Sequence, residues 1–147
     1  MNYVEMKEED IHLITDLYIR TFNNEPWNEQ WEVWSVQKRL SQITKAPDFY
    51  GLMLYHNESL VGFILGNQQQ YYNGIKFEIK EFCIDLLVQN GGYGTKLLTE
   101  FERRLRLQGV DDFLLLTLRN PRTEGFYHKN GYVTSCEMLL MDKVKER

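Results

Sequence analysis

The sequence is short of the residues that build disulfide scaffolds and metal sites. Its two cysteines, Cys83 and Cys136, lie in apolar surroundings and lack CxxC spacing. We therefore expect two buried thiols in a reducing compartment rather than a disulfide framework. The three histidines, His12, His56 and His128, have no metal-binding spacing and no nearby pair of cysteine ligands. The pattern predicts no metal site.

Long apolar runs and basic clusters are also missing. No apolar stretch reaches the roughly 18 residues that a membrane span requires. The beginning, MNYVEMKEED, has neither the basic start nor the apolar stretch of a signal peptide. We therefore expect a cytoplasmic protein without a membrane partner. The formal net charge is −4, and no Lys/Arg cluster rises above short mixed runs, which argues against nucleic acid and is compatible with a cationic partner.

The composition and length fit one compact domain. The chain has 147 residues, of which 43% are hydrophobic, and this suffices for one core but not for two. Elements alternate without a linker, a repeat or a low-complexity segment, so we expect a single domain over residues 1–147. Periodicity and turn signals predict strands at 2–6, 49–56, 60–72, 75–84, 112–118 and 132–141, and helices at 11–22, 31–44, 93–107 and 121–129.

Two of the expected strands carry further information. The run DFLLLTL, at 112–118, is continuously apolar and predicts a strand buried on both faces. In the strand at 75–84, apolar residues fall at odd positions through Ile79 and at even positions from Phe82. One extra residue near Lys80–Glu81, a β-bulge, restores the two-residue period. The alternative is a strand that is buried on both faces at its end.

A glycine-rich turn precedes the third expected helix. The stretch VQNGGYGTKLL holds three glycines within four positions just before an amphipathic pattern. It matches neither a P-loop nor the GxGxxG dinucleotide fingerprint. The arrangement of strand, glycine turn and helix start nevertheless suits a phosphate or pyrophosphate, because unpaired N–H groups and the helix dipole attract anions. The alternative is a plain glycine-rich connection.

Two motifs resemble one family. The residues from Gln89 to Gly94, QNGGYG, match the Q/R-x-x-G-x-G/A signature of the GNAT N-acetyltransferase superfamily. Downstream, Asn120, Thr123 and FYHKNGY at 126–132 resemble its N-x-x-A…F-Y-x-K-x-G-F segment. The order of elements agrees over essentially the whole chain, while Asn90, Thr123 and Leu86 replace residues that are frequent in the family.

The resemblance implies an α/β (α+β) fold with a central mixed, mostly antiparallel sheet flanked by helices. It also implies acetyl-CoA as cosubstrate and no metal. The backbone of the glycine turn with Thr95 would bind the pyrophosphate, and the backbone of Phe82 and Ile84 would pair with the pantetheine arm. The full set of implied cofactor-binding residues is Phe82, Ile84, Gln89, Asn90, Gly91, Gly92, Tyr93, Gly94, Thr95, Asn120, Phe126 and Lys129. The alternatives are a helix cap for Asn120 and a solvent-facing charge for Lys129.

Three residues are candidates for proton transfer. A primary amine has a pKa of about 10, so at neutral pH it must lose a proton before it attacks the thioester. Glu78 matches the family's glutamate on this strand, and Glu81 is the second candidate. Tyr127 matches the family's tyrosine that protonates the leaving thiolate. The alternatives are solvated strand charges for the glutamates and a core aromatic role for Tyr127.

The acceptor is expected beside the stretch NNEPWNEQWEVW, where tryptophans alternate with glutamates. Aromatic faces and carboxylates suit a cationic amine. We take Glu25, Trp27, Trp31 and Tyr71 as candidate substrate-binding residues. A polyamine, an amino sugar, an aminoglycoside-like compound or a protein amine would fit, and the alternative is a helix packed on the sheet. A monomer and a homodimer remain equally open.

The sequence therefore predicts an N-acetyltransferase that moves acetyl from acetyl-CoA to a primary amine by direct transfer in a ternary complex. The alternative is a non-catalytic acyl-CoA-binding regulatory module on the same fold. Such a module would keep the glycine turn but would need neither Glu78 nor Tyr127, so their presence favours an enzyme.

Overall fold

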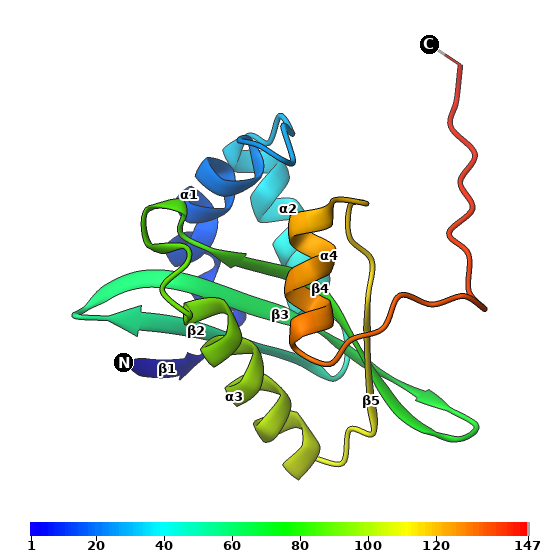
Figure 1. The fold of residues 1–147 in the computed structure, drawn as a ribbon. Helices are drawn as coiled ribbons and strands as arrows, with labels where there is room; N and C mark the ends of the chain where they lie inside the picture. The colour runs from blue at the N-terminus through cyan, green and yellow to red at the C-terminus, as the bar shows by residue number, and fades with distance from the viewer. Residues whose placement is uncertain (147) are drawn as a thin grey trace. The chain divides into compact units, whose positions relative to one another are not determined.

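The computed structural model describes residues 1–146. Five strands form one sheet in the order β1-β2-β3-β4-β5, and Figure 1 labels the strands and helices along the chain. The strands are β1 (Asn2–Glu5), β2 (Phe49–His56), β3 (Ser59–Tyr71), β4 (Gly74–Ile84) and β5 (Asp112–Leu115). The helices are α1 (Ile11–Phe22), α2 (Val33–Thr44), α3 (Tyr93–Leu107) and α4 (Pro121–Lys129), with short 3-10 turns η1 (Glu8–Asp10) and η2 (Leu86–Val88).

The chain divides into two compact units, Met1–Leu116 and Thr117–Arg147. The first unit contains the whole sheet with α1, α2 and α3, and the second contains α4. Strands β1 to β4 pair antiparallel with their neighbours, whereas β4 and β5 pair parallel. The expected mixed, mostly antiparallel sheet is thus confirmed.

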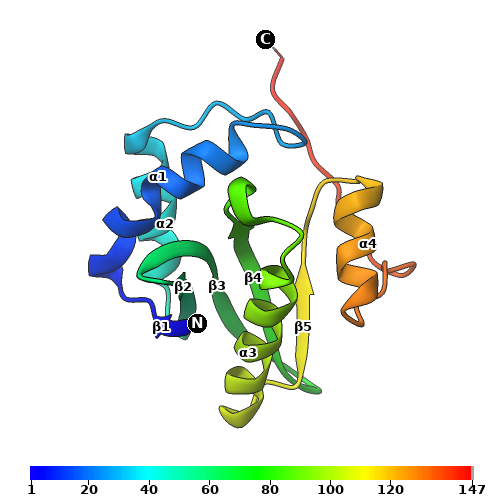
Figure 2. The same cartoon turned by 60° about the vertical axis from the view of Figure 1, so that its left-hand side comes forward.

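Helices α1 and α2 cover one face of the sheet, as Figure 2 shows. Their apolar stripes pack against odd-numbered positions of β2 and β3, among them Met53, Phe63 and Leu65. The buried residues of this cluster on the two helices are Ile14, Leu17, Tyr18, Phe22, Val36, Leu40 and Ile43. Burial of this surface is the main force that holds both helices on the sheet.

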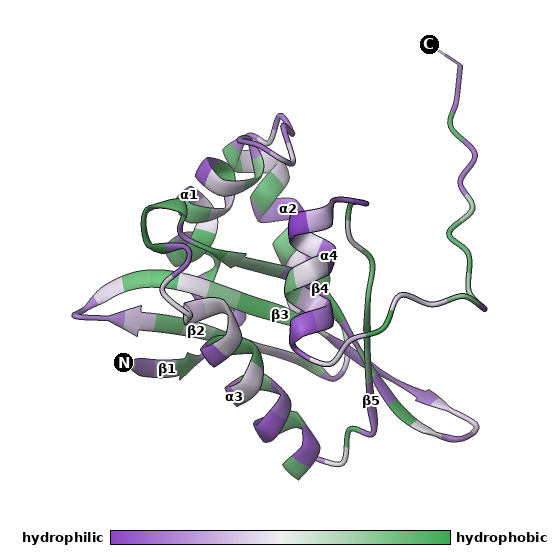
Figure 3. Cartoon of the chain, viewed as in Figure 1, coloured by the Kyte–Doolittle hydropathy of each residue, from purple (hydrophilic) through white to green (hydrophobic). Residues whose placement is uncertain are grey.

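Helix α3 covers the opposite face of the sheet. Phe101 of α3 packs edge-on against Phe77 of β4, with ring centroids 5.3 Å apart, and also contacts Tyr50 of β2. Leu97, Leu98 and Leu105 complete the buried stripe of the helix. Figure 3 shows both hydrophilic and hydrophobic residues along α3, as expected for a helix with one face in the core.

Strand β4 contains the expected bulge. Leu65 pairs with Glu81 and Gly66 pairs with Ile79, so Lys80 is the extra residue. A Cβ atom at Gly66 would lie 1.9 Å from the carbonyl oxygen of Glu78, which explains why a glycine stands at this position. The bulge shifts the side-chain phase of β4, as the sequence period predicts.

Two predictions about the end of the chain were wrong. Residues 132–141 form no strand, and their apolar side chains, such as Leu139 and Met141, are exposed. Alternating or apolar sequence makes a strand only when a neighbouring strand supplies hydrogen bonds, and residues 132–141 have no such pairing among residues 1–146. Strand β5 lies at the edge of the sheet and its residues are exposed or half-buried, so it is not buried on both faces.

Smaller differences concern α2 and the cysteines. Helix α2 begins at Val33 rather than Trp31, because Glu32 occupies the N-cap position with Ser35 bonded back to its N–H. Cys83 is buried as expected, but Cys136 is exposed, because it lies in the segment that does not form a strand. None of the described helices combines the length and apolar character needed to cross a membrane.

Candidate functional site

The bulge places Glu78 and Glu81 on the same face of the sheet. Glu78 lies opposite Asn67, and Glu81 lies opposite Leu65. Because Leu65 and Asn67 are two residues apart on β3, they share a face, and directly paired residues share it with them. That face is the one covered by α1 and α2. Without Lys80 as an extra residue, the two carboxylates would point to opposite faces.

Glu81 is a buried carboxylate that is held by two partners. Its side chain is 8% exposed, and its Oε1 accepts hydrogen bonds from the Tyr18 hydroxyl at 2.9 Å and from Arg39 Nε at 2.5 Å. Burial raises the pKa of Glu81, and the ion pair with Arg39 and the bond from Tyr18 oppose that rise. Burial and the nearby Glu81 charge also raise the pKa of Tyr18, which keeps that hydroxyl a donor.

Glu78 differs from Glu81 in its surroundings. Its side chain is half-buried and forms no ion pair or hydrogen bond with any of residues 1–146. Its carboxylate is therefore not engaged by these residues, whereas that of Glu81 is bonded to Tyr18 and Arg39. This contrast separates the two glutamates that the sequence left as alternatives.

Beyond the bulge, β4 has one edge that β5 does not pair. The parallel ladder with β5 ends at the Ile79–Leu115 pair. On the other edge, Asp85 N–H donates to the carbonyl of Val61 at 2.8 Å. Because hydrogen-bonded and non-bonded pairs alternate along an antiparallel ladder, the backbone groups of Phe82 and Ile84 point away from β3. The carbonyl of Ile84 accepts a bond from the Gln89 side-chain amide at 2.9 Å.

The glycine turn leads directly into α3. Asn90 and Gly92 have positive φ angles of 74° and 79°, and a Cβ atom at Gly92 would meet nothing within 4 Å. The first helical bond runs from Lys96 N–H to the carbonyl of Gly92. No side chain caps the helix, and the N–H groups of residues 93–95 have no partner among residues 1–146. Free N–H groups at a helix N-terminus, together with the helix dipole, are features that suit an anion.

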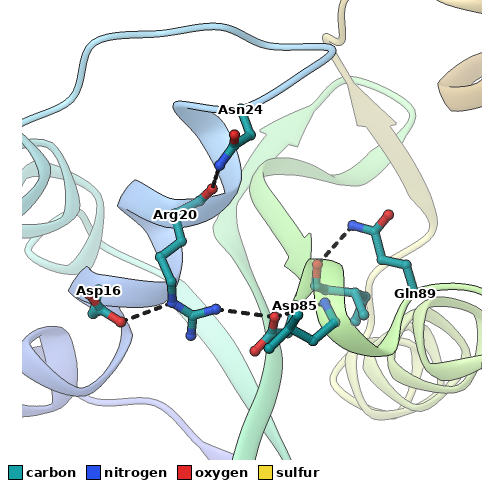
Figure 4. A network of polar contacts seen from close by, with 7 residues as sticks. Asp16, Arg20, Asn24, Asp85 and Gln89 are labelled. Atoms are coloured by element: carbon teal, nitrogen blue, oxygen red, sulfur yellow. Dashed lines mark hydrogen bonds and ion pairs between the residues drawn. The ribbon is translucent and has the colours of Figure 1, made fainter.

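A polar network connects α1 with the segment that leads into this turn (Figure 4). Arg20 donates to Asp16 at 2.9 Å and to Asp85 at 3.1 Å, while Asp85 also accepts from the Leu87 N–H at 3.0 Å. Asp85 therefore caps η2 and anchors it to α1. Together with the Gln89–Ile84 bond, these contacts fix the path of residues 84–89.

Two candidate acceptor residues pack beside α1 rather than along one face of a helix. The Trp27 ring contacts Phe22 with centroids 5.4 Å apart, and the Trp31 ring meets Tyr18 edge-on at 5.2 Å. The Trp31 indole N–H donates to Glu29 at 2.9 Å. Since Tyr18 also binds Glu81, the structure brings Trp31 close to the bulge of β4.

The other two candidate acceptor residues, Glu25 and Tyr71, form no hydrogen bond, ion pair or ring contact with Trp27 or Trp31 within residues 1–146. Glu25 is exposed in the turn after α1. Tyr71 lies at the tip of the β3–β4 hairpin, where it pairs with Gly74 and its ring lies 4.6 Å from the ammonium of Lys76. Tyr71 lies four positions along β3 from Asn67, which corresponds to about 13 Å along a strand. The structure therefore does not bring Tyr71 together with the glutamates.

The second unit contains the downstream motif. Asn120 is the N-cap of α4, where its Oδ1 accepts from the N–H groups of Arg122 and Thr123 at 2.9 and 3.3 Å. The Tyr127 ring packs between Phe126 and Tyr132, with centroids 5.2 and 5.5 Å away, and burial raises its pKa. Lys129 is exposed in the last turn of α4.

The partners of the buried acidic residues are not among the residues predicted from the sequence. Tyr18 and Arg39 are 63 and 42 residues away from Glu81, and Arg20 is 65 residues away from Asp85. The sequence position of Tyr18 places it on the apolar stripe of α1, with Ile14 and Leu17. A polar hydroxyl within such a stripe was the available signal, because buried tyrosines usually find a hydrogen-bond partner.

Comparison with known families gives one clear result. The model described as the acetyltransferase (GNAT) family matches residues 12–132. That range includes both β4 with the glycine turn and the α4 motif. No curated protein sequence shows a significant match to the chain.

Solved structures with the same fold are numerous and distant in sequence. An aminoglycoside acetyltransferase from an uncultured soil metagenomic sample, solved with sisomicin, has a TM-score of 0.75 and 14% identity, with 99% of this chain and 96% of that chain covered. A possible acetyltransferase from Clostridium difficile 630 has a TM-score of 0.78 and 11% identity, with 98% of each chain covered. A transcriptional regulator from Bacillus halodurans C-125 has a TM-score of 0.77 and 19% identity, with 97% and 99% covered.

Proposed function

Because the chain belongs to the GNAT acetyltransferase family, we propose that it transfers acetyl from acetyl-CoA to a primary amine by direct attack in a ternary complex. The main support for the proposal is the local structure of residues 74–95. There a bulged strand with one unpartnered glutamate runs into a glycine turn and an uncapped helix.

The described residues fit acetyl-CoA at two points. At the first turn of α3, three N–H donors and the open space beside Gly92 suit the two negative charges of a pyrophosphate. Along β4, the outward-directed N–H of Ile84 suits an amide carbonyl of the pantetheine arm. When bound, acetyl-CoA supplies an acetyl thioester that an amine can attack.

Glu78 is the proposed general base. It would take the proton of the acceptor ammonium, directly or through water, because a protonated amine has no lone pair for attack. Glu81 has a different proposed role: its bonds with Tyr18 and Arg39 hold α1 and α2 against the bulge and so keep Glu78 in place. Backbone N–H groups beside the bulge would polarise the thioester carbonyl.

Tyr127 is the proposed acid for the leaving thiolate. A phenol with an ordinary pKa of about 10 is already protonated at neutral pH, and burial raises the pKa of Tyr127 further, so the residue holds a proton that it can donate. Its motif, FYHKNGY, lies within the matched family range up to residue 132. By the family resemblance, Asn120, Phe126 and Lys129 are proposed as further cofactor-binding residues.

The proposed acceptor is a small cationic amine. Trp27 and Trp31 offer aromatic surface, and Glu29 adds a carboxylate fixed by the Trp31 indole. One structural neighbour is an aminoglycoside acetyltransferase solved with sisomicin, which makes amino sugars a reasonable first choice. Polyamines and protein amines have the same chemistry.

An amine panel tests the function. Purified protein is incubated with acetyl-CoA and aminoglycosides, polyamines, amino sugars or peptides, and free thiol and acetylated product are measured. We expect one class to be acetylated. Glu78→Gln should lower kcat/KM at neutral pH by about 10²- to 10⁴-fold, with partial recovery near pH 10, where free amine is abundant.

Glu81→Gln is the matched control, and it should lower kcat/KM much less. Binding of acetyl-CoA without turnover of any amine would favour the regulatory module instead. Equal rates for the wild type and Glu78→Gln at all pH values would remove Glu78 from the mechanism.

A further inference from the structure

A buried amide oxygen lies next to the proposed base. Asn67 on β3 is 4% exposed, and its Nδ2 donates to the carbonyl of Ile43 at 3.1 Å. Its Oδ1 is buried and has no hydrogen-bond partner among residues 1–146. A buried acceptor without a partner is unfavourable, and most such groups in proteins are satisfied.

The orientation of this amide follows from its anchor. Ile43 lies in the last turn of α2, and its carbonyl can only accept a hydrogen bond. The nitrogen of the Asn67 amide must therefore point toward α2, which directs Oδ1 away from Ile43. If the Asn67 amide were rotated by 180°, its oxygen would face the Ile43 carbonyl, and two acceptors cannot form a hydrogen bond.

Asn67 lies directly opposite Glu78 across the β3–β4 ladder, and the two side chains share a face. The Cβ atoms of such a pair lie about 4.5 to 5.5 Å apart. An ionised Glu78 offers only acceptors and cannot satisfy Asn67 Oδ1. A protonated Glu78 carries an O–H donor, and it is the product of general-base catalysis.

We propose that Asn67 is a positioning residue that accepts a hydrogen bond from Glu78 after Glu78 has taken the proton of the acceptor amine. The inference rests on the proposed function. In the step, an N–H bond of the ammonium breaks and an O–H bond forms on Glu78. The new O–H donates to Asn67 Oδ1 until the proton passes to solvent. The unpartnered oxygen of the resting protein thus has a partner during turnover.

The first test uses NMR of the full chain without any substrate. The side-chain amide signal of Asn67 is followed as the pH is lowered. Other ionisable groups that face this region from the packed elements are Glu81 on β4, Arg39 on α2 and Tyr18 on α1. We expect the Asn67 signal to move with pH in the wild type and in Glu81→Gln, and to stay in place in Glu78→Gln.

A signal that does not move, or that still moves in Glu78→Gln, would overturn the proposal. A pH-independent contact between Asn67 and a slowly exchanging water would also overturn it, because water would then be the permanent partner. These outcomes do not depend on turnover, so they are distinct from a failure of the amine panel.

The second test is kinetic and uses the amine that the panel identifies. Asn67→Leu should lower kcat about tenfold, the scale of one hydrogen bond, and leave KM nearly unchanged. In the Glu78→Gln background the same change should have no further effect on kcat. Leu52→Val, a buried substitution on β2, controls for lost stability. Equal losses in both backgrounds would show that Asn67 acts only on the fold.

Discussion

Each end of α3 has a glycine with a positive φ angle. The two ends differ in whether the backbone N–H groups beside that glycine have hydrogen-bond partners. Gly92 and Gly109 have φ angles of 79° and 98°, and a Cβ at either position would meet nothing within 4 Å. At the C-terminal end, the N–H groups of Gln108, Gly109 and Val110 bond to the carbonyls of Arg106 and Leu105. At the N-terminal end, the N–H groups of residues 93–95 have no partner within residues 1–146.

The glutamates of β4 repeat this contrast. Glu81 is buried and bonded to Tyr18 and Arg39, whereas Glu78, three residues earlier on the same face, has no partner among the described residues. The groups that have hydrogen-bond or ion-pair partners contribute to the stability of the fold. In these two comparisons, the groups without partners are the ones to which the pyrophosphate and the proton of the acceptor amine are assigned. Substitution of a group that has partners should therefore lower the unfolding free energy. Substitution of a group without partners should lower acetyl-CoA affinity or the rate of transfer.

The largest expected effect is at Gly92. Gly92→Val and Gly109→Val impose the same left-handed strain, about 1–2 kcal/mol, so both variants should lose a similar amount of stability. Only Gly92→Val places a side chain where the pyrophosphate is expected. We expect its Kd for acetyl-CoA in calorimetry to rise by about 100-fold or more, since several charge-assisted hydrogen bonds are lost. A similar rise in Gly109→Val would mean that the effect comes from the fold of α3.

The second prediction compares two tyrosines whose pKa values burial raises, Tyr18 and Tyr127. Tyr127→Phe should lower kcat by about 10²-fold, the scale of lost acid catalysis, with little change in acetyl-CoA affinity. Tyr18→Phe removes a donor from buried Glu81 and should instead lower the unfolding free energy by about 1–3 kcal/mol. Stopped-flow kinetics and urea unfolding separate the two. An unchanged kcat in Tyr127→Phe, with chemistry rate-limiting, would exclude its role as the acid.

The smallest effect is expected at Glu100, a residue of α3 whose carboxylate has ion-pair partners. Its bonds with Arg103 and Arg104 lower its pKa from 4.5 to about 2. A lowered pKa in the folded state contributes stability above pH 4.5, and that contribution is lost as the pH falls toward 2. Glu100→Gln should therefore cost at most about 1 kcal/mol at pH 7. The difference from the wild type should vanish near pH 2 in thermal unfolding, and a pH-independent difference would contradict this assignment.

Much of this arrangement is local and therefore predictable. The change of phase between Ile79 and Phe82 indicated the bulge, and the stretch from Gln89 to Gly94 indicated a glycine turn that leads into a helix. Both depend on residues close in sequence. The extent of α1 was also predicted correctly, because its apolar stripe and its breaker residues are local signals.

Long-range features were not predictable from the sequence. The partners of Glu81 come from two helices more than 40 residues away. The exposed segment 132–141 has the composition of a strand, but composition does not reveal whether a pairing edge is present. The different surroundings of Glu78 and Glu81 likewise became visible only in the structure, because the two residues have the same side chain and lie three positions apart in the sequence.

The N-terminal end of α3, with its unpartnered N–H groups, is the proposed binding site for acetyl-CoA. The most direct measurement is a titration of the labelled full chain with acetyl-CoA to about 1 mM, the upper range of typical KM values, with backbone amide shifts recorded by NMR. We predict the largest shifts at Tyr93, Gly94 and Thr95, and nearly none at Gln108 to Val110. An absence of shifts, or equal shifts at both ends of α3, would contradict the account.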